Sequence, residues 1–161
     1  MTRTVVDTSA LIALLSPDDE HNRSAATLLR EAAEEGALLI NPVVYAELAA
    51  DPFFGSRSDL DDFLDDTGIA VEGLPRAAQF EAGEAFRRYL NRRGEELQCS
   101  ECGHETTFPC PDCDASITAR QHVAADFLIG AHAATVDALL TFDRGFYRDY
   151  FDVTCRAVRG R

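Results

Sequence analysis

Four acidic side chains lie where apolar runs of the sequence begin or end, and their chemistry suits the binding of a divalent cation. Asp7 follows the run 4–6, Glu47 lies within the run 42–48, Asp126 opens the run 126–131, and Asp143 follows the run 138–142. An unpaired carboxylate among buried residues costs several kcal/mol unless a partner or a cation balances its charge. We therefore predict one metal site formed by these four acids.

A hard cation such as Mg2+ or Mn2+ prefers carboxylate oxygens, keeps several waters and accepts a substrate phosphate into its shell. The chemistry that this favours is phosphodiester hydrolysis, in which the metal acidifies a water and a second ion, about 4 Å away, steadies the leaving oxygen. Each acid taken alone has an ordinary alternative as a helix cap or a turn residue. Four such placements together favour the metal site.

Other carboxylate chemistry fits the sequence less well. A phosphatase of the haloacid dehalogenase type needs a second aspartate two residues after the first, where this chain has Ser9. The chain contains no lysine, which excludes a G-x-x-x-x-G-K phosphate loop and the lysine of response-regulator receivers. The histidines form no close pair for metal-free acid and base catalysis, and we expect all of them on the surface: His21, His104, His122 and His132.

Strand and helix patterns alternate along the chain, which predicts an α/β fold. The expected strands are 3–7, 37–40, 69–71, 137–141 and 153–158; the expected helices are 9–15, 22–35, 42–50, 59–66, 75–96 and 124–134; and 142–151 is expected to be a Phe-rich turn segment. Such a pattern predicts a three-layer α/β/α sandwich with a mainly parallel central sheet, as one domain over 1–161. Ligands bind at the carboxyl ends of such strands, where Asp7 and Asp143 fall.

The motifs around the acids resemble those of the PIN-domain ribonucleases, particularly the VapC type of toxin-antitoxin systems. The matching segments are Asp7-Thr8-Ser9, the run 42–48 around Glu47, the run 125–133 around Asp126, and 141–146 around Asp143. The resemblance implies a metal-dependent endoribonuclease with these acids as its catalytic, metal-binding residues. It also implies a homodimer and a cognate antitoxin that covers the cleft. Ser9 and Thr141 match polar positions where a hydroxyl can orient a carboxylate or water, although local backbone hydrogen bonding would explain them equally well.

Four cysteines in a segment absent from the standard family pattern predict a second, different metal site. Cys99, Cys102, Cys110 and Cys113 form two C-x2-C pairs separated by seven residues, which is typical of a tetrahedral Zn2+ site. We expect a small zinc-ribbon-like insert at 97–116 that is structured by its metal, with disulfides as the weaker alternative. Cys155 is expected to be a core residue.

Arginines cluster close to this insert in the sequence. They could dock RNA by stacking and phosphate pairing, or they could pair with Glu84, Glu95 and Glu96 on a solvated helix face. The candidates are Arg87, Arg88, Arg92, Arg93 and Arg120.

The composition of the chain indicates the kind of cell that it comes from more than the ligand that it binds. The net charge is -13 and all 15 basic residues are arginine, a bias that resembles proteins of salt-loving cells, where salt screens surface repulsion. So acidic a chain lacks the general basic surface of a nucleic-acid-binding protein. No apolar run reaches the roughly 20 residues of a membrane helix, and the start of the chain shows no signal-peptide pattern, so we expect a cytoplasmic protein.

Three functions remain open at this point. The first is a ribonuclease toxin that cleaves structured RNA with Mg2+ or Mn2+. The second is a ribosomal-RNA maturation nuclease that combines a PIN domain with a zinc ribbon, although in those enzymes the ribbon follows the domain. The third is a zinc-ribbon module that binds RNA or protein on a scaffold that no longer cuts, against which the four intact acids weigh.

Overall fold

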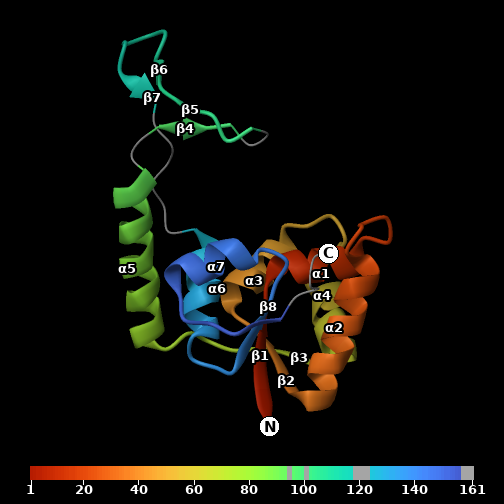
Figure 1. The fold of residues 1–161 in the computed structure, drawn as a ribbon. Coiled ribbons are helices and arrows are strands. Elements are labelled where there is room, and N and C mark those ends of the chain that lie inside the picture. The colour runs from red at the N-terminus through yellow and green to blue at the C-terminus, as the bar shows by residue number, and fades with distance from the viewer. Residues whose placement is uncertain (94–95, 100–101, 118–123, 157–161) are drawn as a thin grey trace.

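A five-stranded parallel sheet forms the centre of the molecule, with strand order β3-β2-β1-β8-β9 (Figure 1). The computed structural model describes residues 1–93, 96–99, 102–117 and 124–156. The strands are β1 (Thr2–Val6), β2 (Gly36–Ile40), β3 (Ile69–Val71), β8 (Ala138–Leu140) and β9 (Cys155–Arg156), and all neighbours pair in parallel. The parallel α/β sheet predicted from the sequence is confirmed.

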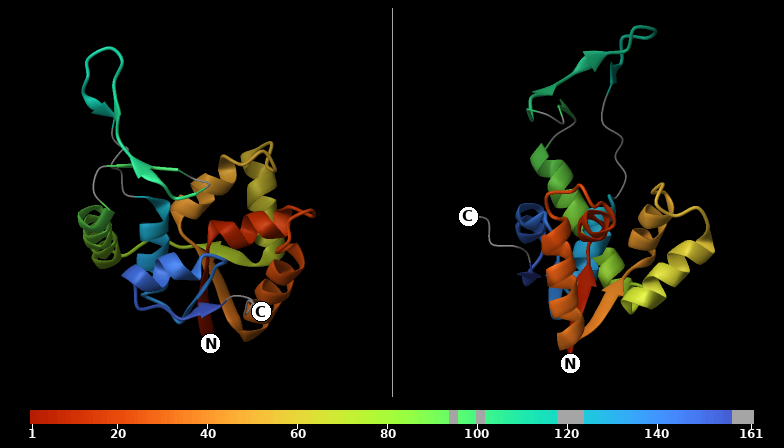
Figure 2. Two further views of the ribbon diagram at one scale, coloured as in Figure 1. Left: turned by 45° about the horizontal axis from the view of Figure 1, so that its top comes forward. Right: turned by 90° about the vertical axis from the view of Figure 1, so that its right-hand side faces the viewer.

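Helices cover both faces of this sheet. Helix α2 packs on β1 and β2 and against α1, whereas α6 packs on β1 and β8 and against α5. Two views show α2 and α5 on opposite sides of the sheet (Figures 1 and 2). The helices are α1 (Thr8–Leu15), α2 (Asn22–Glu35), α3 (Pro42–Ala49), α4 (Arg57–Thr67), α5 (Arg76–Arg93), α6 (Ala125–Ala133) and α7 (Arg144–Tyr150).

Side-chain caps fix where two of the helices begin. The Asn41 carboxamide oxygen accepts from the backbone N–H groups of Val43 and Val44, at 2.9 and 3.0 Å, with Pro42 in the first turn of α3. Ser56 accepts from the Asp59 N–H at 3.2 Å, so α4 begins two residues before the predicted start. Each cap satisfies N–H groups that the helix itself leaves unpaired.

The central strands owe their position to burial on both faces. Val5 and Val6 of β1 and Leu139 and Leu140 of β8 are completely buried, as expected for the middle of a parallel sheet. The Asp7 N–H donates to the Leu140 carbonyl at 3.0 Å and so continues the pairing one residue past β1. The first predicted acid is thereby held at the carboxyl end of the sheet.

Two sequence expectations are wrong. The segment 142–151 is not a turn region but contains helix α7, which begins after Asp143, whose carboxylate accepts from the Phe146 N–H at 3.4 Å. His132 is not a surface residue, because its side chain is fully buried under α6. The last strand, β9, begins at Cys155, two residues after the predicted start, and the predicted end at 158 lies outside the described residues.

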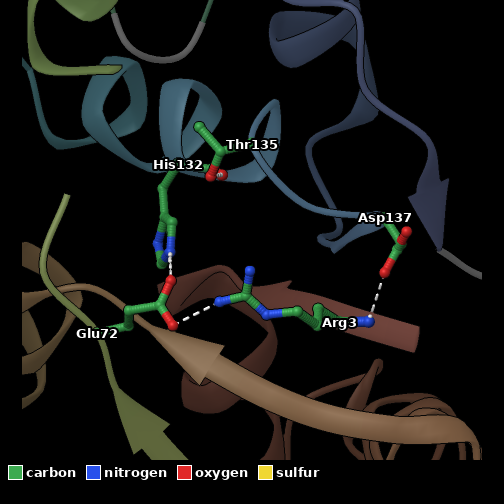
Figure 3. A network of polar contacts seen from close by, with 5 residues as sticks. All are labelled: Arg3, Glu72, His132, Thr135 and Asp137. Carbon is green, nitrogen blue, oxygen red and sulfur yellow. Dashed lines mark hydrogen bonds and ion pairs between the residues drawn. The ribbon is translucent and has the colours of Figure 1, made fainter. Parts of the chain in front are cut away.

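A polar network beneath α6 joins this helix to the sheet (Figure 3). The His132 Nε2 lies 3.4 Å from a carboxylate oxygen of Glu72, and the other oxygen of Glu72 accepts from the Arg3 guanidinium. The backbone N–H of Arg3 donates to Asp137 at 2.8 Å, and the Thr135 hydroxyl donates to the His132 carbonyl at 2.7 Å. The network therefore connects β1, the residue after β3, and the C-terminal half of α6.

Two small antiparallel hairpins extend from the region after α5, away from the sheet (Figures 1 and 2). The first pairs β4 (Leu97–Gln98) with β5 (Glu105–Thr106), and the second pairs β6 (Phe108–Pro109) with β7 (Ser116–Ile117). Each pairs only within itself among the described residues. No helix in the described part of the chain is both long enough and apolar enough to cross a membrane.

Candidate functional site

Asp7 is the buried centre of the predicted acidic site. Its side chain lies at the end of β1 and the residue is only 4% exposed. One of its carboxylate oxygens accepts from the Ser9 hydroxyl at 2.8 Å and from the Thr141 hydroxyl at 2.7 Å. Although Asp7 precedes α1, its side chain makes no capping hydrogen bond to that helix. Helix capping therefore does not explain why an aspartate stands at this position.

Thr141 connects Asp7 to Asp143. Its hydroxyl donates to Asp7 and accepts from the Asp143 N–H at 3.0 Å, while the Ser9 hydroxyl accepts from the Phe142 N–H at 3.4 Å. Thr141 itself is completely buried, whereas Asp143 is exposed and caps α7. The two hydroxyls thus fix the orientation of Asp7 and the backbone leading to Asp143.

Glu47 reaches the same region from α3. It is half-buried, and one of its carboxylate oxygens accepts from the Thr8 hydroxyl. Sequence reasoning assigned no role to Thr8, although it stands between two residues that were singled out. Because Thr8 immediately follows Asp7, its contact brings the carboxylate of α3 beside the end of β1.

Asp126 lies in the first turn of α6, two residues past the N-cap Ala124, and its side chain is accessible to solvent on one side. Burial of its other side, and then the negative charges of Asp7, Glu47 and Asp143, raise the pKa of Asp126 to about 6. Burial makes the largest contribution, but the three carboxylates also contribute, which indicates that they lie in the electrostatic neighbourhood of Asp126. Asp126 therefore senses acids from elements that are far apart in the sequence.

Tyr147 is a neighbour of these acids that sequence reasoning missed. It lies in α7, is only 1% exposed, and its hydroxyl makes no hydrogen bond of good geometry with any described residue. Burial, and then the charges of Asp7 and Asp126, raise the pKa of this phenol. No signal marked it in the sequence, because the helix that carries it was predicted as a turn.

The donor set fits a hard cation. All four acids offer carboxylate oxygens, and none forms an ion pair with a basic side chain in the part of the chain that the structure describes. Their negative charges thus remain uncompensated by protein. In their present rotamers no three His, Cys, Asp or Glu side chains among the described residues enclose an ion position. Mg2+ is commonly held by one or two carboxylates plus waters and phosphate, so a site for this ion does not need three protein ligands around it.

The structure separates the cysteines into two pairs. Cys99 and Cys102 lie at the turn of the β4–β5 hairpin, and Cys110 and Cys113 at the turn of the β6–β7 hairpin. The four sulfurs are not gathered into one cluster in the described residues. The predicted zinc site is therefore not confirmed. Cys155 lies in β9, is half-buried, and packs against the hydrophobic core.

Two of the predicted arginines contact α7. Arg88 donates to the Tyr150 carbonyl at 3.2 Å, and Arg92 pairs with Asp149 at 3.4 Å while lying over the Tyr150 ring. Arg93 donates to the Tyr89 hydroxyl. Arg87 is exposed, and Arg120 lies outside the described residues. These contacts tie α5 to the helix that Asp143 caps.

Comparison with known protein families identifies the family of this fold. A family model described as PIN domain matches residues 4–99, which include Asp7 and Glu47. The chain belongs to the PIN domain family. The match covers more than half of the chain, and Asp126 and Asp143 of this PIN domain lie beyond the matched residues.

Two solved structures share the fold of this PIN domain over nearly its full length. One is a crystal structure of VapBC2 from Rickettsia felis bound to a promoter DNA fragment, with a TM-score of 0.57, 16% identity, and coverage of 96% of this chain and 97% of that one. The other is DNA-bound VapBC from Salmonella typhimurium, with a TM-score of 0.54, 15% identity, and coverage of 97% and 98%. At this identity the likeness concerns the fold.

Proposed function

We propose that this PIN domain is an endoribonuclease that depends on Mg2+ or Mn2+ and acts as the toxin of a type II toxin-antitoxin system. The observation that carries the proposal is the placement of Asp7: a buried carboxylate held by two hydroxyls and surrounded by three further acids without a basic partner among the described residues. Family membership supports nuclease chemistry, and the VapBC neighbours support the toxin assignment.

Each residue has a distinct role in this proposal. Asp7, Glu47, Asp126 and Asp143 hold the cation, and a bound cation supplies acidification of the attacking water and neutralisation of the phosphate. Ser9 and Thr141 both donate to one oxygen of Asp7 and so fix the orientation of this carboxylate. The exposure of Asp126 and Asp143 leaves the site open to an RNA backbone.

The partners follow from the same proposal. The substrate is RNA, a cognate antitoxin covers the acids, and the protein acts in the cytoplasm as a homodimer. The domain spans 1–161, interrupted by the insert at 97–116. Arg87, Arg88, Arg92, Arg93 and Arg120 are the candidate RNA contacts; Arg88 and Arg92 already border α7, the helix that begins after Asp143.

An RNA cleavage assay tests the nuclease proposal. Total RNA is incubated with the protein and Mg2+ or Mn2+ at low and high salt, beside Asp7→Asn and Asp126→Asn. We expect cleavage by the wild type and a loss of more than about 100-fold in both variants, since each removes a carboxylate from the cation. Asp65→Asn, an exposed carboxylate in α4, is the matched control and should cleave normally.

Two results would contradict the proposal. Cleavage that survives chelation of divalent cations would exclude the metal-dependent reaction. RNA binding without cleavage, equal in the wild type and both variants, would indicate a binding module instead. The toxin assignment has its own test: expression in cells should arrest growth unless the product of a short neighbouring gene is co-expressed, and no arrest together with cleavage in vitro would favour an RNA-processing enzyme.

A further inference from the structure

The turns of the two hairpins share one backbone geometry. In the first turn, the Cys99 N–H donates to the His104 carbonyl at 2.9 Å, and the Gly103 N–H donates back to the Cys99 carbonyl at 3.0 Å. Gly103 has a φ of 72°, in the left-handed region that suits glycine. The chain therefore turns back sharply just after Cys102. We name this turn, with Cys99, Cys102, Gly103 and His104, the first knuckle.

The second turn repeats the two hydrogen bonds and the left-handed residue of the first at the same spacing from its first cysteine. The Cys110 N–H donates to the Ala115 carbonyl at 2.8 Å, and the Asp114 N–H donates to the Cys110 carbonyl at 2.9 Å. Asp114, the residue after Cys113, has a φ of 59° and is the one non-glycine residue with positive φ in the described ranges. A left-handed conformation costs a non-glycine residue about 1 kcal/mol or more. We name this turn, with Cys110, Cys113, Asp114 and Ala115, the second knuckle.

Two unrelated loops would not be expected to share the same cysteine spacing, the same pair of hydrogen bonds and the same left-handed residue. The shared geometry puts both cysteines of each pair on one turn. In the second knuckle the N–H groups of Asp112 and Cys113 lie close to the Cys110 sulfur. Cys102 and Cys113 are exposed, so their sulfurs are accessible to a ligand. Each knuckle thus presents half of a tetrahedral thiolate set.

An apolar pair on the second hairpin indicates that something packs against it. Phe108 and Ile117 face each other across β6 and β7, and they are 56% and 43% exposed. A two-stranded hairpin with such short strands is marginally stable by itself in water. The nearest apolar partner along the chain is the first hairpin, where Leu97 is half-buried.

We propose that Cys99, Cys102, Cys110 and Cys113 bind one Zn2+ and that this metal holds the two hairpins against each other, covering Phe108 and Ile117. In the present structure the hairpins are separate (Figure 2), so the metal supplies the connection that the short strands cannot. Each cysteine that binds as thiolate releases one proton to solvent. Four thiolates close the shell of the zinc, which makes the site structural, whereas the oxygen site around Asp7 prefers a harder ion.

Metal titration of the full chain tests the site. The protein is stripped of metal under reducing conditions and titrated with Co2+, and then with Zn2+. We expect one Co2+ per chain with the intense charge-transfer absorption of a tetrathiolate and its displacement by one Zn2+. Absence of this absorption would overturn the proposal, and so would half a metal per chain, which would mean a site shared between two copies.

Single cysteine variants locate the ligands. Cys102→Ser and Cys113→Ser each remove one sulfur from a different knuckle, and each should abolish the tetrathiolate spectrum. Cys155→Ser is the matched control, because Cys155 lies in β9 outside both knuckles, and it should bind one Zn2+ normally. Far-UV circular dichroism checks that the sheet remains folded in each variant. Loss of binding in Cys155→Ser, or normal binding in either knuckle variant, would contradict the assignment.

A tryptophan reporter tests the closing of the hairpins independently of the spectrum. The chain contains no tryptophan, so Phe108→Trp introduces a single indole, which can be excited selectively, at an exposed aromatic position. Zn2+ should shift its emission to shorter wavelength as the indole is covered, and a chelator should reverse the shift. The double variant with Cys113→Ser should show no shift. An emission spectrum that is unchanged when Zn2+ binds would show that the hairpins do not close on the apolar pair.

Discussion

The acids around Asp7 and the cysteines of the two hairpins each offer four candidate ligands, but the protein positions them in different ways. Asp7 is held by the pairing of β1 with β8 and by the hydroxyls of Ser9 and of the buried Thr141. The sulfurs of Cys110 and Cys113 are held only by a local turn within a hairpin of two-residue strands. A core determines the first arrangement, and a short stretch of backbone determines the second.

This difference separates two ways of building a metal site. Around Asp7 the fold already brings the charges together: burial, and then the charges of Asp7, Glu47 and Asp143, raise the pKa of Asp126 before any cation binds. In the insert each half of the site is formed, but the halves are apart. A cation would relieve repulsion in the first region and would supply tertiary structure in the second.

The largest expected effect comes from making one variant in each region and measuring RNA cleavage, zinc content and thermal unfolding in both. Asp7→Asn should reduce RNA cleavage by more than about 100-fold. It should still bind zinc, because the substituted residue lies at the end of β1 and not in the hairpins. Cys113→Ser should lose its zinc yet keep the unfolding temperature of the sheet, because the hairpins pair only within themselves. Metal analysis, RNA cleavage and thermal unfolding of both proteins provide the readouts.

Two outcomes of these measurements would contradict the contrast between the acidic site and the hairpins. If Cys113→Ser lowered the unfolding temperature as much as a core substitution does, the hairpins would be part of the main cooperative unit, and the contrast between the two regions would be wrong. If Asp7→Asn lost zinc, the two sites would be coupled.

The hydroxyl of Thr141 offers the next largest effect. Thr141→Val removes a 2.7 Å donor to Asp7 and the acceptor of the Asp143 N–H while keeping the shape of the side chain. We expect activity to fall by about 10–100-fold, as is usual when a hydrogen-bond partner of a metal ligand is removed. Initial rates of RNA cleavage at several Mn2+ concentrations measure it, and the deficit should shrink as Mn2+ rises.

Two control variants sharpen this prediction. Thr141→Ser keeps the hydroxyl and should retain most of the activity. Thr135→Val removes a hydroxyl that donates only to the His132 carbonyl, and it should leave the Mn2+ dependence unchanged. Equal loss in Thr141→Val and Thr141→Ser would attribute the effect to packing and not to the hydroxyl.

Sequence patterns predicted the sheet and the position of its acids because both follow from strong, local signals. Apolar runs gave the buried strands, and the rule that parallel strands end at one edge gave the placement of Asp7 and Asp143. The Asn41-Pro42 start of α3 was predictable for the same reason, since the cap and the following proline are adjacent in the sequence.

What the sequence could not reveal depends on partners that are distant along the chain. His132 is buried because Glu72 and Arg3, from other elements, reach it, and nothing near position 132 signals this. Helix α7 was missed because Gly145 and its aromatic residues obscure the helical period, so Tyr147 was missed with it. The cysteine spacing predicted the two knuckles, but two-residue strands carry no periodicity.

A smaller effect is expected from the packing of α6, which carries Asp126. Gly130 lies one helical turn after Asp126, and a methyl group at this position would lie 2.4 Å from the Phe151 ring. Gly130→Ala should therefore lower the free energy of unfolding by about 1–3 kcal/mol. Gly83 in α5 has open space around it, so Gly83→Ala should stabilise the protein by up to about 1 kcal/mol. Urea unfolding measures both, and a neutral Gly130→Ala would show that Phe151 moves aside freely.

The smallest effect concerns the pH dependence of the sheet, through His132. Burial lowers the pKa of this imidazole from its ordinary value near 6.5, with the Glu72 carboxylate acting in the opposite direction and Arg3 adding to the lowering. The folded state thus binds a proton less readily than the unfolded state. The stabilisation is fully present above about pH 6.5 and is lost as the pH falls through the depressed pKa of the folded protein.

Urea unfolding of the wild type and His132→Gln at several pH values between neutral and mildly acidic measures this loss. The variant should be less stable at neutral pH, because it disturbs the network under α6, but its stability should fall less steeply with acidification. The Arg3 guanidinium lowers the pKa of Glu72, so this carboxylate titrates further into the acid range. Its contribution to the pH dependence of the free energy of unfolding therefore falls at a lower pH than that of His132. Equal slopes in both proteins would mean that His132 takes up its proton without leaving its place, and that α6, with Asp126, is held to the sheet by packing and not by this network.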